Sequence, residues 1–214
     1  MHLNLRRCLR HSTMHLSAVE SRPLRGSIVR EVGEYESRML QRYFAHLAKC
    51  EKPEILDIGP ISGNNISVFL SLGAKLSVCD FILRLTNKMP GQELEKALGI
   101  LDYRDYRFDG IHVWDIPDHL ETWLLTDLVK TWFALLKPNG LLVMMAGPSS
   151  TPQPYLHIAR LVRGTTVQLQ EIRAKELAYF HRSNRDIEIV MRPLEQRTSY
   201  LCTNGEREFL FGRP

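Results

Sequence analysis

The chain has 214 residues and a formal net charge of +4, and 44% of its residues are hydrophobic while 24% are charged. These values are ordinary for a globular protein, and the length suits one domain that can bury its core without covalent staples. The longest purely apolar runs span only a few residues, which excludes a transmembrane helix and a membrane partner.

The four cysteines are far apart, with no C-x-x-C pair and no nearby histidine at zinc spacing. They are Cys8, Cys50, Cys79 and Cys202. This pattern argues against a disulfide framework or a structural metal, so we expect no bound metal and a reducing, cytoplasmic environment. The N-terminal segment is basic but lacks the apolar stretch of a signal peptide.

The positive charge is concentrated near the N-terminus. Arg6, Arg7 and Arg10 precede Met14, and without them the chain has 25 basic and 24 acidic residues, a net charge of +1. We therefore expect residues 1–25 to be a basic extension and residues 26–214 to form the folded domain. Nucleic-acid binding gains little support from this charge distribution.

The first predicted elements alternate between helix and strand. Apolar residues recur at three and four between residues 28 and 47, which predicts an amphipathic helix of about five turns. A short strand follows at 54–58, then a helix over 66–72 that ends at Gly73, then a strand at 75–80.

The alternation continues through the middle of the chain. We expect a charged helix at 92–98, a weakly marked strand at 100–102 and a clearer strand at 108–114. A strongly amphipathic helix spans 120–136, and a buried strand follows at 141–145. Short apolar strands between helices are typical of a parallel sheet covered on both faces, so the sequence predicts a doubly wound α/β fold.

The C-terminal part departs from this alternation. After a loop at 147–154 and a stretch without a clear pattern, a short helix is expected at 183–190. Two β-rich runs, 196–202 and 207–211, flank Asn204-Gly205, and Asn-Gly between such runs is a strong hairpin signal. A mostly parallel sheet should therefore finish with an antiparallel hairpin.

A glycine loop follows the first buried strand, in the sequence EILDIGPISGNN at residues 54–65. A strand, glycine loop and helix together offer backbone N–H groups and a helix N-terminus to an anionic ligand. Only Gly59 and Gly63 are glycines, so the loop does not have the G-x-G-x-x-G spacing. Taken alone, it is equally compatible with a cofactor loop and with a structural turn.

The end of the next strand favours a nucleoside site. Asp80 lies 23 residues beyond Asp57, at the position where an acid accepts hydrogen bonds from ribose hydroxyls. An aspartate that merely begins a loop is the alternative. The pair in its strand–helix–strand frame favours nucleoside binding.

Five segments then occur in the order found in a known family. They are LDIGPISG, SVCD, FDGIHVWDIPDHL, LLKPNGLLVMM and the terminal hairpin. From about residue 28 to the C-terminus the chain resembles the class I S-adenosylmethionine-dependent methyltransferases. The resemblance implies a Rossmann-like, seven-stranded sheet with its last strand antiparallel, S-adenosylmethionine as cofactor, and methyl transfer to an acceptor.

The resemblance also implies roles for individual residues. The glycine loop would lie under the methionine moiety, the acid after the second strand would bind the ribose, and its neighbour would pack near the adenine. Asp102, with Asp105 as a competitor, would contact the adenine amino group. The residues implied in cofactor binding are Asp57, Gly59, Pro60, Ser62, Gly63, Asp80, Phe81, Asp102, Trp114 and Asp115.

The loop departs from the family pattern at one position. Ile61 stands where a glycine is common, so either its side chain points into the protein or the pocket is altered. Asn64 and Asn65 are polar where the helix begins, and they would either cap the helix or contact the cofactor carboxylate.

Other residues are candidates for the acceptor side. The segment Asp118-His119-Leu120 resembles the Glu-His-Leu found in members that act on small molecules, and His119 is a candidate base because histidine titrates near neutrality. A histidine that packs at a helix start is the alternative. Trp123 and Trp132 are expected in the core.

Two further segments are open to more than one interpretation. His157, Arg160 and Arg163 form a basic patch that is either a solvated helix face or a contact for an acidic substrate. Residues 179–182, Tyr-Phe-His-Arg, either line the substrate side of the cleft or form a loop that leads into a helix.

Three rival functions remain beside a methyltransferase for a small-molecule acceptor. A nucleotide-dependent oxidoreductase would need the missing glycine and would not need the terminal hairpin. A methyltransferase-like binding or scaffold protein without catalysis is compatible with Ile61 and the weak third strand. RNA methylation is favoured only by the basic extension, and the N-P-P-Y or N-P-P-F signature of amino-directed nucleic-acid methylation is absent.

Overall fold

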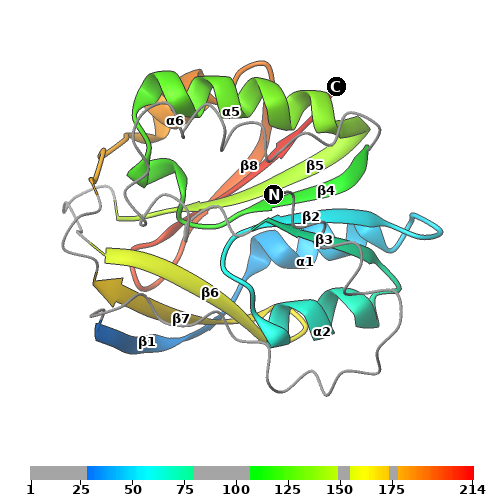
Figure 1. Ribbon diagram of the computed structural model, residues 1–214, viewed down its shortest axis with the longest axis horizontal. Coiled ribbons are helices and arrows are strands. Elements are labelled where there is room, and N and C mark those ends of the chain that lie inside the picture. Colours follow the sequence, from blue (N-terminus) through cyan, green and yellow to red (C-terminus); the bar gives the residue numbers. More distant parts are fainter. Residues whose placement is uncertain (1–27, 80–106, 149–154, 174–177) are drawn as a thin grey trace, which may run out of the picture.

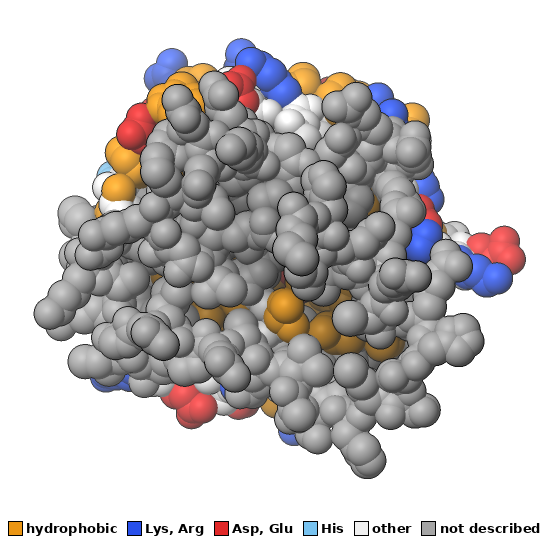
Figure 2. All heavy atoms as spheres, in the orientation of Figure 1, with side chains coloured by type: hydrophobic (Ala, Val, Ile, Leu, Met, Phe, Trp, Pro, Cys, Tyr) orange, Lys and Arg blue, Asp and Glu red, His pale blue; other side chains and the backbone are white. Residues whose placement is uncertain are grey.

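A computed structural model describes residues 28–79, 107–148, 155–173 and 178–214. The described chain forms a six-stranded sheet with helices on both faces and a second, three-stranded sheet below it (Figure 1). In the space-filling view, charged side chains lie along the rim of the molecule (Figure 2). None of the helices in these ranges is long and apolar enough to cross a membrane.

The large sheet is mixed. Its strands, in spatial order, are β3 (Lys75–Cys79), β2 (Glu54–Ile58), β4 (Phe108–Val113), β5 (Leu136–Ala146), β9 (Arg207–Gly212) and β8 (Glu195–Leu201). β3, β2, β4 and β5 run parallel to one another, whereas β9 runs antiparallel to both β5 and β8. The α/β prediction is confirmed. The strand expected at 100–102, which would be the seventh, lies outside the described residues.

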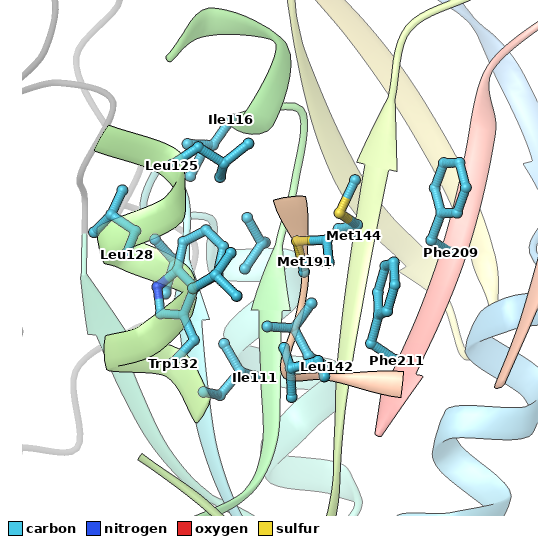
Figure 3. Close-up of a cluster of buried hydrophobic side chains, with 14 of the residues drawn as sticks. Ile111, Ile116, Leu125, Leu128, Trp132, Leu142, Met144, Met191, Phe209 and Phe211 are labelled. Atoms are coloured by element: carbon cyan, nitrogen blue, oxygen red, sulfur yellow. The ribbon is translucent and has the colours of Figure 1, made fainter. Parts of the chain in front are cut away.

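One face of the large sheet is covered by α5 (Thr122–Leu135) and α6 (Asn184–Val190). A short 3-10 turn, η4 (Pro117–His119), precedes α5, and a loop precedes α6. Figure 3 shows Trp132, Leu125 and Leu128 of α5 pointing at apolar side chains of β4, β5 and β9. Trp132 is completely buried, as the sequence predicts, but Trp123 is 54% exposed and does not belong to the core.

The other face is covered by α1 (Arg38–Leu47) and α2 (Gly63–Ser71). The Ser37 hydroxyl caps α1 by accepting a hydrogen bond from the N–H of Leu40 at 3.0 Å. Just beyond the C-terminal end of α2, Gly73 has φ 71°, a conformation that a residue with a Cβ adopts only at a cost. Gly73 therefore ends this helix as predicted.

The long helix predicted for residues 28–47 is wrong in its first half. Residues 28–36 form strand β1 (Ile28–Glu36), which pairs antiparallel with β7 (Thr166–Arg173). Gly33, at φ 145°, lies at a shift in this pairing, and a helix interior would be destabilised by such a glycine. The pairing partner is more than 100 residues away, so the local spacing of apolar residues did not reveal it.

The stretch without a clear sequence pattern forms the rest of the small sheet, in the order β1–β7–β6, with β6 spanning Tyr155–Arg163. Gly164, at φ 54°, lies in the turn between β6 and β7. His157, Arg160 and Arg163 therefore lie on a strand, and their interpretation as a helix face is wrong. The segment 28–36 and the segment 155–173, neither of which was predicted as strand, thus build a separate sheet beside α2 (Figure 1).

Candidate functional site

The glycine loop connects β2 to α2 at the carboxyl ends of the parallel strands. The N–H of Gly59 donates to the carbonyl of Cys79 at 3.2 Å, which ties the loop to β3. Ser62 caps α2 by accepting from the N–H of Asn65 at 3.4 Å. Among the described residues, no acceptor is found for the N–H groups of Gly63 and Asn64, so the first turn of α2 offers two donors to a ligand.

Gly59 is closely packed, but against the protein itself. A Cβ built on Gly59 would lie 2.6 Å from Cδ1 of Trp114, and the indole N–H of Trp114 donates to Asp57 Oδ1 at 2.9 Å. Both partners are buried. The structure thus brings together three residues that the sequence placed at the cofactor, and the need for a glycine at position 59 comes from the neighbouring indole ring.

Asn65 has a structural role that the sequence did not suggest. Its side-chain amide donates to the carbonyl of Ala159 at 3.2 Å and accepts from the N–H of Leu161 at 2.8 Å. These two bonds fasten the start of α2 to β6. Asn64 is exposed and Ile61 is half-buried. The predicted cofactor residues Asp80, Phe81 and Asp102, and the competing Asp105, lie outside the described residues.

A buried group of acids and histidines lies beyond the carboxyl end of β4; we call Asp115, Asp118, His119, His157 and Glu206 the acid–histidine cluster. Asp115 is at its centre: Oδ2 accepts the backbone N–H of His157 at 2.8 Å and lies 3.0 Å from His157 Nδ1 and 3.6 Å from His119 Nε2. Burial alone would raise the pKa of Asp115, but the two histidines lower it to about 2.

The two histidines respond to the same carboxylate. Burial would lower the pKa of His157, yet Asp115, Glu206 and Glu171 raise it to about 9. His119 is also shifted upward: burial lowers its pKa, and the larger combined effect of Asp115, the Ala178 carbonyl and Asp118 raises it. Both imidazoles are therefore held toward the protonated form, so neither is available as a base in this state of the protein.

Asp118 has a different environment from Asp115. Its Oδ2 accepts the N–H of Gly147 at 2.8 Å and lies 4.0 Å from Nη2 of Arg207. Burial and the charge of Asp115 raise the pKa of Asp118 to about 6. A Cβ built on Gly147 would lie 3.2 Å from the hydroxyl of Tyr179 and 3.6 Å from Asp118 Oδ2. The two groups therefore face the same spot, just after the end of β5.

Two arginines hold the loops around this spot. Arg207 donates from Nε to the carbonyl of Gly147 at 2.7 Å and from Nη1 to the carbonyl of Arg182 at 2.9 Å. Arg182 in turn donates to the carbonyls of Pro117 and Leu120. Because these donors bind main-chain oxygens, the two arginines connect the segments after β4 and β5 with the segment before α6.

Several buried polar atoms of this region have no hydrogen-bond partner among the residues that the structure describes. They are Asp115 Oδ1, Asp118 Oδ1, His119 Nε2, Tyr179 Oη, Glu206 Oε2 and Arg207 Nη2. Buried polar atoms are nearly always paired with protein, water or ligand. His119 Nε2 and Arg207 Nη2 face carboxylates at 3.6 and 4.0 Å, and the other four atoms are able to bind a polar ligand. Within the described ranges no group of three or more His, Cys, Asp and Glu residues is arranged to hold a metal ion.

Sequence reasoning found part of this region and missed the rest. It singled out Asp115, His119, His157 and Tyr179, which the structure brings close to one another. It missed Glu206 and Arg207 because the sequence around them predicts a hairpin, and a hairpin does not by itself indicate a binding or catalytic role. The one available signal is their charge: both follow the hairpin turn directly and are almost completely buried.

The comparison with solved structures identifies the fold. No protein-family model and no curated protein matches this sequence. Among solved structures, a putative S-adenosylmethionine-dependent methyltransferase from Listeria monocytogenes has a TM-score of 0.52 at 11% identity, with 82% of this chain and 96% of that chain covered. A similar enzyme from Methanosarcina mazei has a TM-score of 0.51 at 12% identity, with 83% and 97% covered.

A third structure contains ligands. The 1,6-didemethyltoxoflavin-N1-methyltransferase of Burkholderia thailandensis, solved with its substrate and S-adenosylhomocysteine bound, has a TM-score of 0.50 at 15% identity, with 82% of this chain and 78% of that chain covered. At such low identities the similarity concerns the fold. The chain therefore has the fold of the S-adenosylmethionine-dependent methyltransferases, as the sequence motifs predict.

Proposed function

We propose that this protein is an S-adenosylmethionine-dependent methyltransferase that methylates a small-molecule acceptor in the cytoplasm. One observation carries the proposal: within this fold, the glycine loop after β2 and the acid–histidine cluster after β4 lie at the same edge of the parallel sheet. Ligands of open α/β sheets bind at the carboxyl ends of the strands, so a donor and an acceptor would meet here.

The residues present fit the cofactor in part. The free N–H groups of Gly63 and Asn64 suit a carboxylate at the start of α2, and Asp80 is the predicted ribose ligand. The indole ring of Trp114 covers Gly59, so a cofactor would contact the other N–H groups of the loop and not the backbone of Gly59. When bound, S-adenosylmethionine supplies an electrophilic methyl group on a sulfonium, and the protein mainly has to orient and desolvate the reactants.

On the acceptor side, Asp118 is the group best suited to take a proton. It is buried, its Oδ1 has no hydrogen-bond partner, and the pKa of about 6 leaves it mostly ionised at neutral pH. The hydroxyl of Tyr179 lies against the same spot. His119, the base suggested by the sequence, instead donates from Nδ1 toward the carbonyl of Ala178 and faces Asp115, which suits it to positioning.

A calorimetric titration tests the proposal. We expect heat on titration of S-adenosylmethionine into the protein and none with NAD. Binding of NAD alone would identify an oxidoreductase, and no heat with either ligand would contradict the enzyme. An Asp80→Ala variant should lose S-adenosylmethionine binding, whereas Asp127→Ala, on the exposed face of α5, should keep it.

One observation favours a second candidate, a binding module without catalysis. The indole of Trp114 fills the space beside Gly59 and bonds to Asp57, which narrows the approach to the loop. A module of this kind would show no transfer of a labelled methyl group to any acceptor, and its biological activity would persist in Asp80→Ala. Loss of that activity together with cofactor binding would favour the enzyme.

RNA methylation depends on the basic extension, whose residues are not among those described. Deleting residues 1–13 should leave methyl transfer to a small acceptor unchanged. If salt-sensitive RNA binding exists and disappears with this deletion, the RNA alternative gains support.

A further inference from the structure

An open cavity lies at the other end of the large sheet, where β5 begins. It measures about 550 Å³, and we call it the α1 groove, after the helix that forms one wall. Its lining residues are Arg42, Ala45, His46, Lys49, Asn139, Leu141, Arg197 and Leu210. This size lies within the range of small-molecule sites. Because β5 starts at the groove and its other end, Ala146, precedes the Gly147 that donates to Asp118, the groove is distant from the acid–histidine cluster.

The charged side chains of the groove are all basic. Arg42, Lys49 and Arg197 carry full positive charges, and no aspartate or glutamate lines the cavity. Helix α1 itself contains no acidic residue. Within the described ranges neither Arg42 nor Lys49 forms an ion pair, so their charges are uncompensated.

Two acids lie near the groove. Glu195 lies 3.0 Å from Nη1 of Arg197 and so compensates that one rim cation, whereas Asp109 lies 2.8 Å from Nζ of Lys137, outside the groove. Arg197 is further placed by its packing against Gly212, where a Cβ would meet its Nε at 2.6 Å. The groove therefore keeps an excess of positive charge on an ordered rim.

The floor of the groove is apolar. Leu141 of β5 and Leu210 of β9 are at most 9% exposed, and Ala45 of α1 lies beside them. Asn139, near the start of β5 and with φ 62°, adds a polar residue to the lining. A basic rim above an apolar floor matches a ligand with an anionic head and an apolar body.

We propose that the α1 groove is a second ligand site, separate from the methyl-transfer site, and that it takes a small organic phosphate. The phosphate dianion would lie between the guanidinium groups and Lys49, because arginine binds phosphate oxygens in a bidentate manner and lysine adds a point charge. The organic body would rest on Leu141 and Leu210.

Phenyl phosphate is a suitable probe, because it has this chemistry and no adenosine that could enter the cofactor loop. On titration into ¹⁵N-labelled protein, we expect saturable shifts of the backbone amides of Ala45, His46 and Asn139, and unchanged amides at Gly59 and Gly63. Phenol should bind at least about tenfold more weakly, since it lacks the charge. Equal binding of phenol, or shifts confined to other regions, would overturn the proposal.

Charge reversal tests the rim. The double variant Arg42→Glu and Lys49→Glu changes two exposed side chains and should reduce phenyl phosphate affinity at least about tenfold. Arg185→Glu, on the exposed side of α6, is the matched control and should bind as the wild type does. Thermal unfolding checks that each variant is folded. Unchanged affinity in the folded double variant, or an equal loss in the control, would refute the site.

Discussion

His112 and His157 are both buried, yet their surroundings are opposite in kind. His112, inside β4, is enclosed by the rings of Tyr43, Phe69 and Trp114 at centroid distances of 4.7, 4.8 and 5.0 Å, and burial lowers its pKa to about 3. His157 has three carboxylates around it, and its pKa is raised to about 9.

The difference shows what decides the state of a buried histidine in this protein. Burial lowers the pKa in both cases, and in the aromatic cluster of Tyr43, Phe69, His112 and Trp114 nothing opposes it. In the acid–histidine cluster the carboxylates outweigh it. The uncharged aromatic cluster therefore lies next to the glycine loop, and the groups that titrate near neutrality belong to the acid–histidine cluster, where we propose that an acceptor binds.

The largest effect is expected from Asp115→Asn. The change leaves His119 and His157 buried without their shared carboxylate, and we expect the free energy of unfolding to fall by about 3–5 kcal/mol. Urea denaturation measures this loss, and NMR should show the pKa of His157 moving down toward that of His112. Asp127→Asn, at an exposed ion pair with Lys130, should cost under about 1 kcal/mol.

The pH dependence of stability should be nearly as large. The pKa of His157 rises from 6.5 to about 9 on folding, so its contribution is complete below pH 6.5 and disappears as the pH rises through 9. Glu206, with its pKa raised to about 8 by burial, acts in the same direction. We expect a loss of roughly 3 kcal/mol between pH 6.5 and 9.

Denaturant titrations at several pH values measure this slope. His157→Gln should be less stable than the wild type at pH 6.5 and should lose much less stability on going to pH 9. An equally steep decline in the variant would show that the slope arises elsewhere in the protein.

A smaller effect is expected at the border between the two clusters. Gly59→Ala places a methyl group against Trp114 and should destabilise the protein by about 1–3 kcal/mol. In a Trp114→Leu background the same change should cost less, because the indole ring is gone. A double-mutant cycle measures the coupling, and additive effects would mean that Gly59 is a glycine for another reason.

The smallest effect concerns a hydroxyl group. Tyr43 Oη is buried without a partner, so Tyr43→Phe should leave the stability unchanged or raise it by up to about 1 kcal/mol. Tyr35 Oη donates to Glu208 Oε1 at 2.9 Å, and Tyr35→Phe should instead cost about 1–2 kcal/mol. Thermal unfolding of the pair gives the comparison, which fails if both variants lose stability equally.

The elements that the sequence predicts correctly are those with strong local signals. The helix over Thr122–Leu135 has a sustained apolar face, and the strands Glu54–Ile58 and Phe108–Val113 are short apolar runs bounded by turns. β1 was missed because its pairing partner, β7, lies more than 100 residues away, and the adjacent strands β6 and β7 were missed because their stretch shows no clear sequence pattern. Amphipathic spacing near β1 then favoured a helix that the chain does not form.

The candidate site shows the same division. Asp115 and His119 are four residues apart on one segment, so their proximity was predictable. His157 and Glu206 come from β6 and from the turn before β9, and only the closed fold brings them to Asp115. The raised pKa values depend on this meeting of distant segments, and so no local pattern reveals which acid would titrate near neutrality.

The side chain of Asn65 also has a consequence for self-association. In the described part of the chain β6 pairs with β7 on one side only, and the open edge of such a strand is a template for pairing with another chain. By donating to Ala159 and accepting from Leu161, the Asn65 amide imitates the next strand for one residue pair. A single carboxamide on the helix that follows the glycine loop thus blocks part of that edge against another molecule.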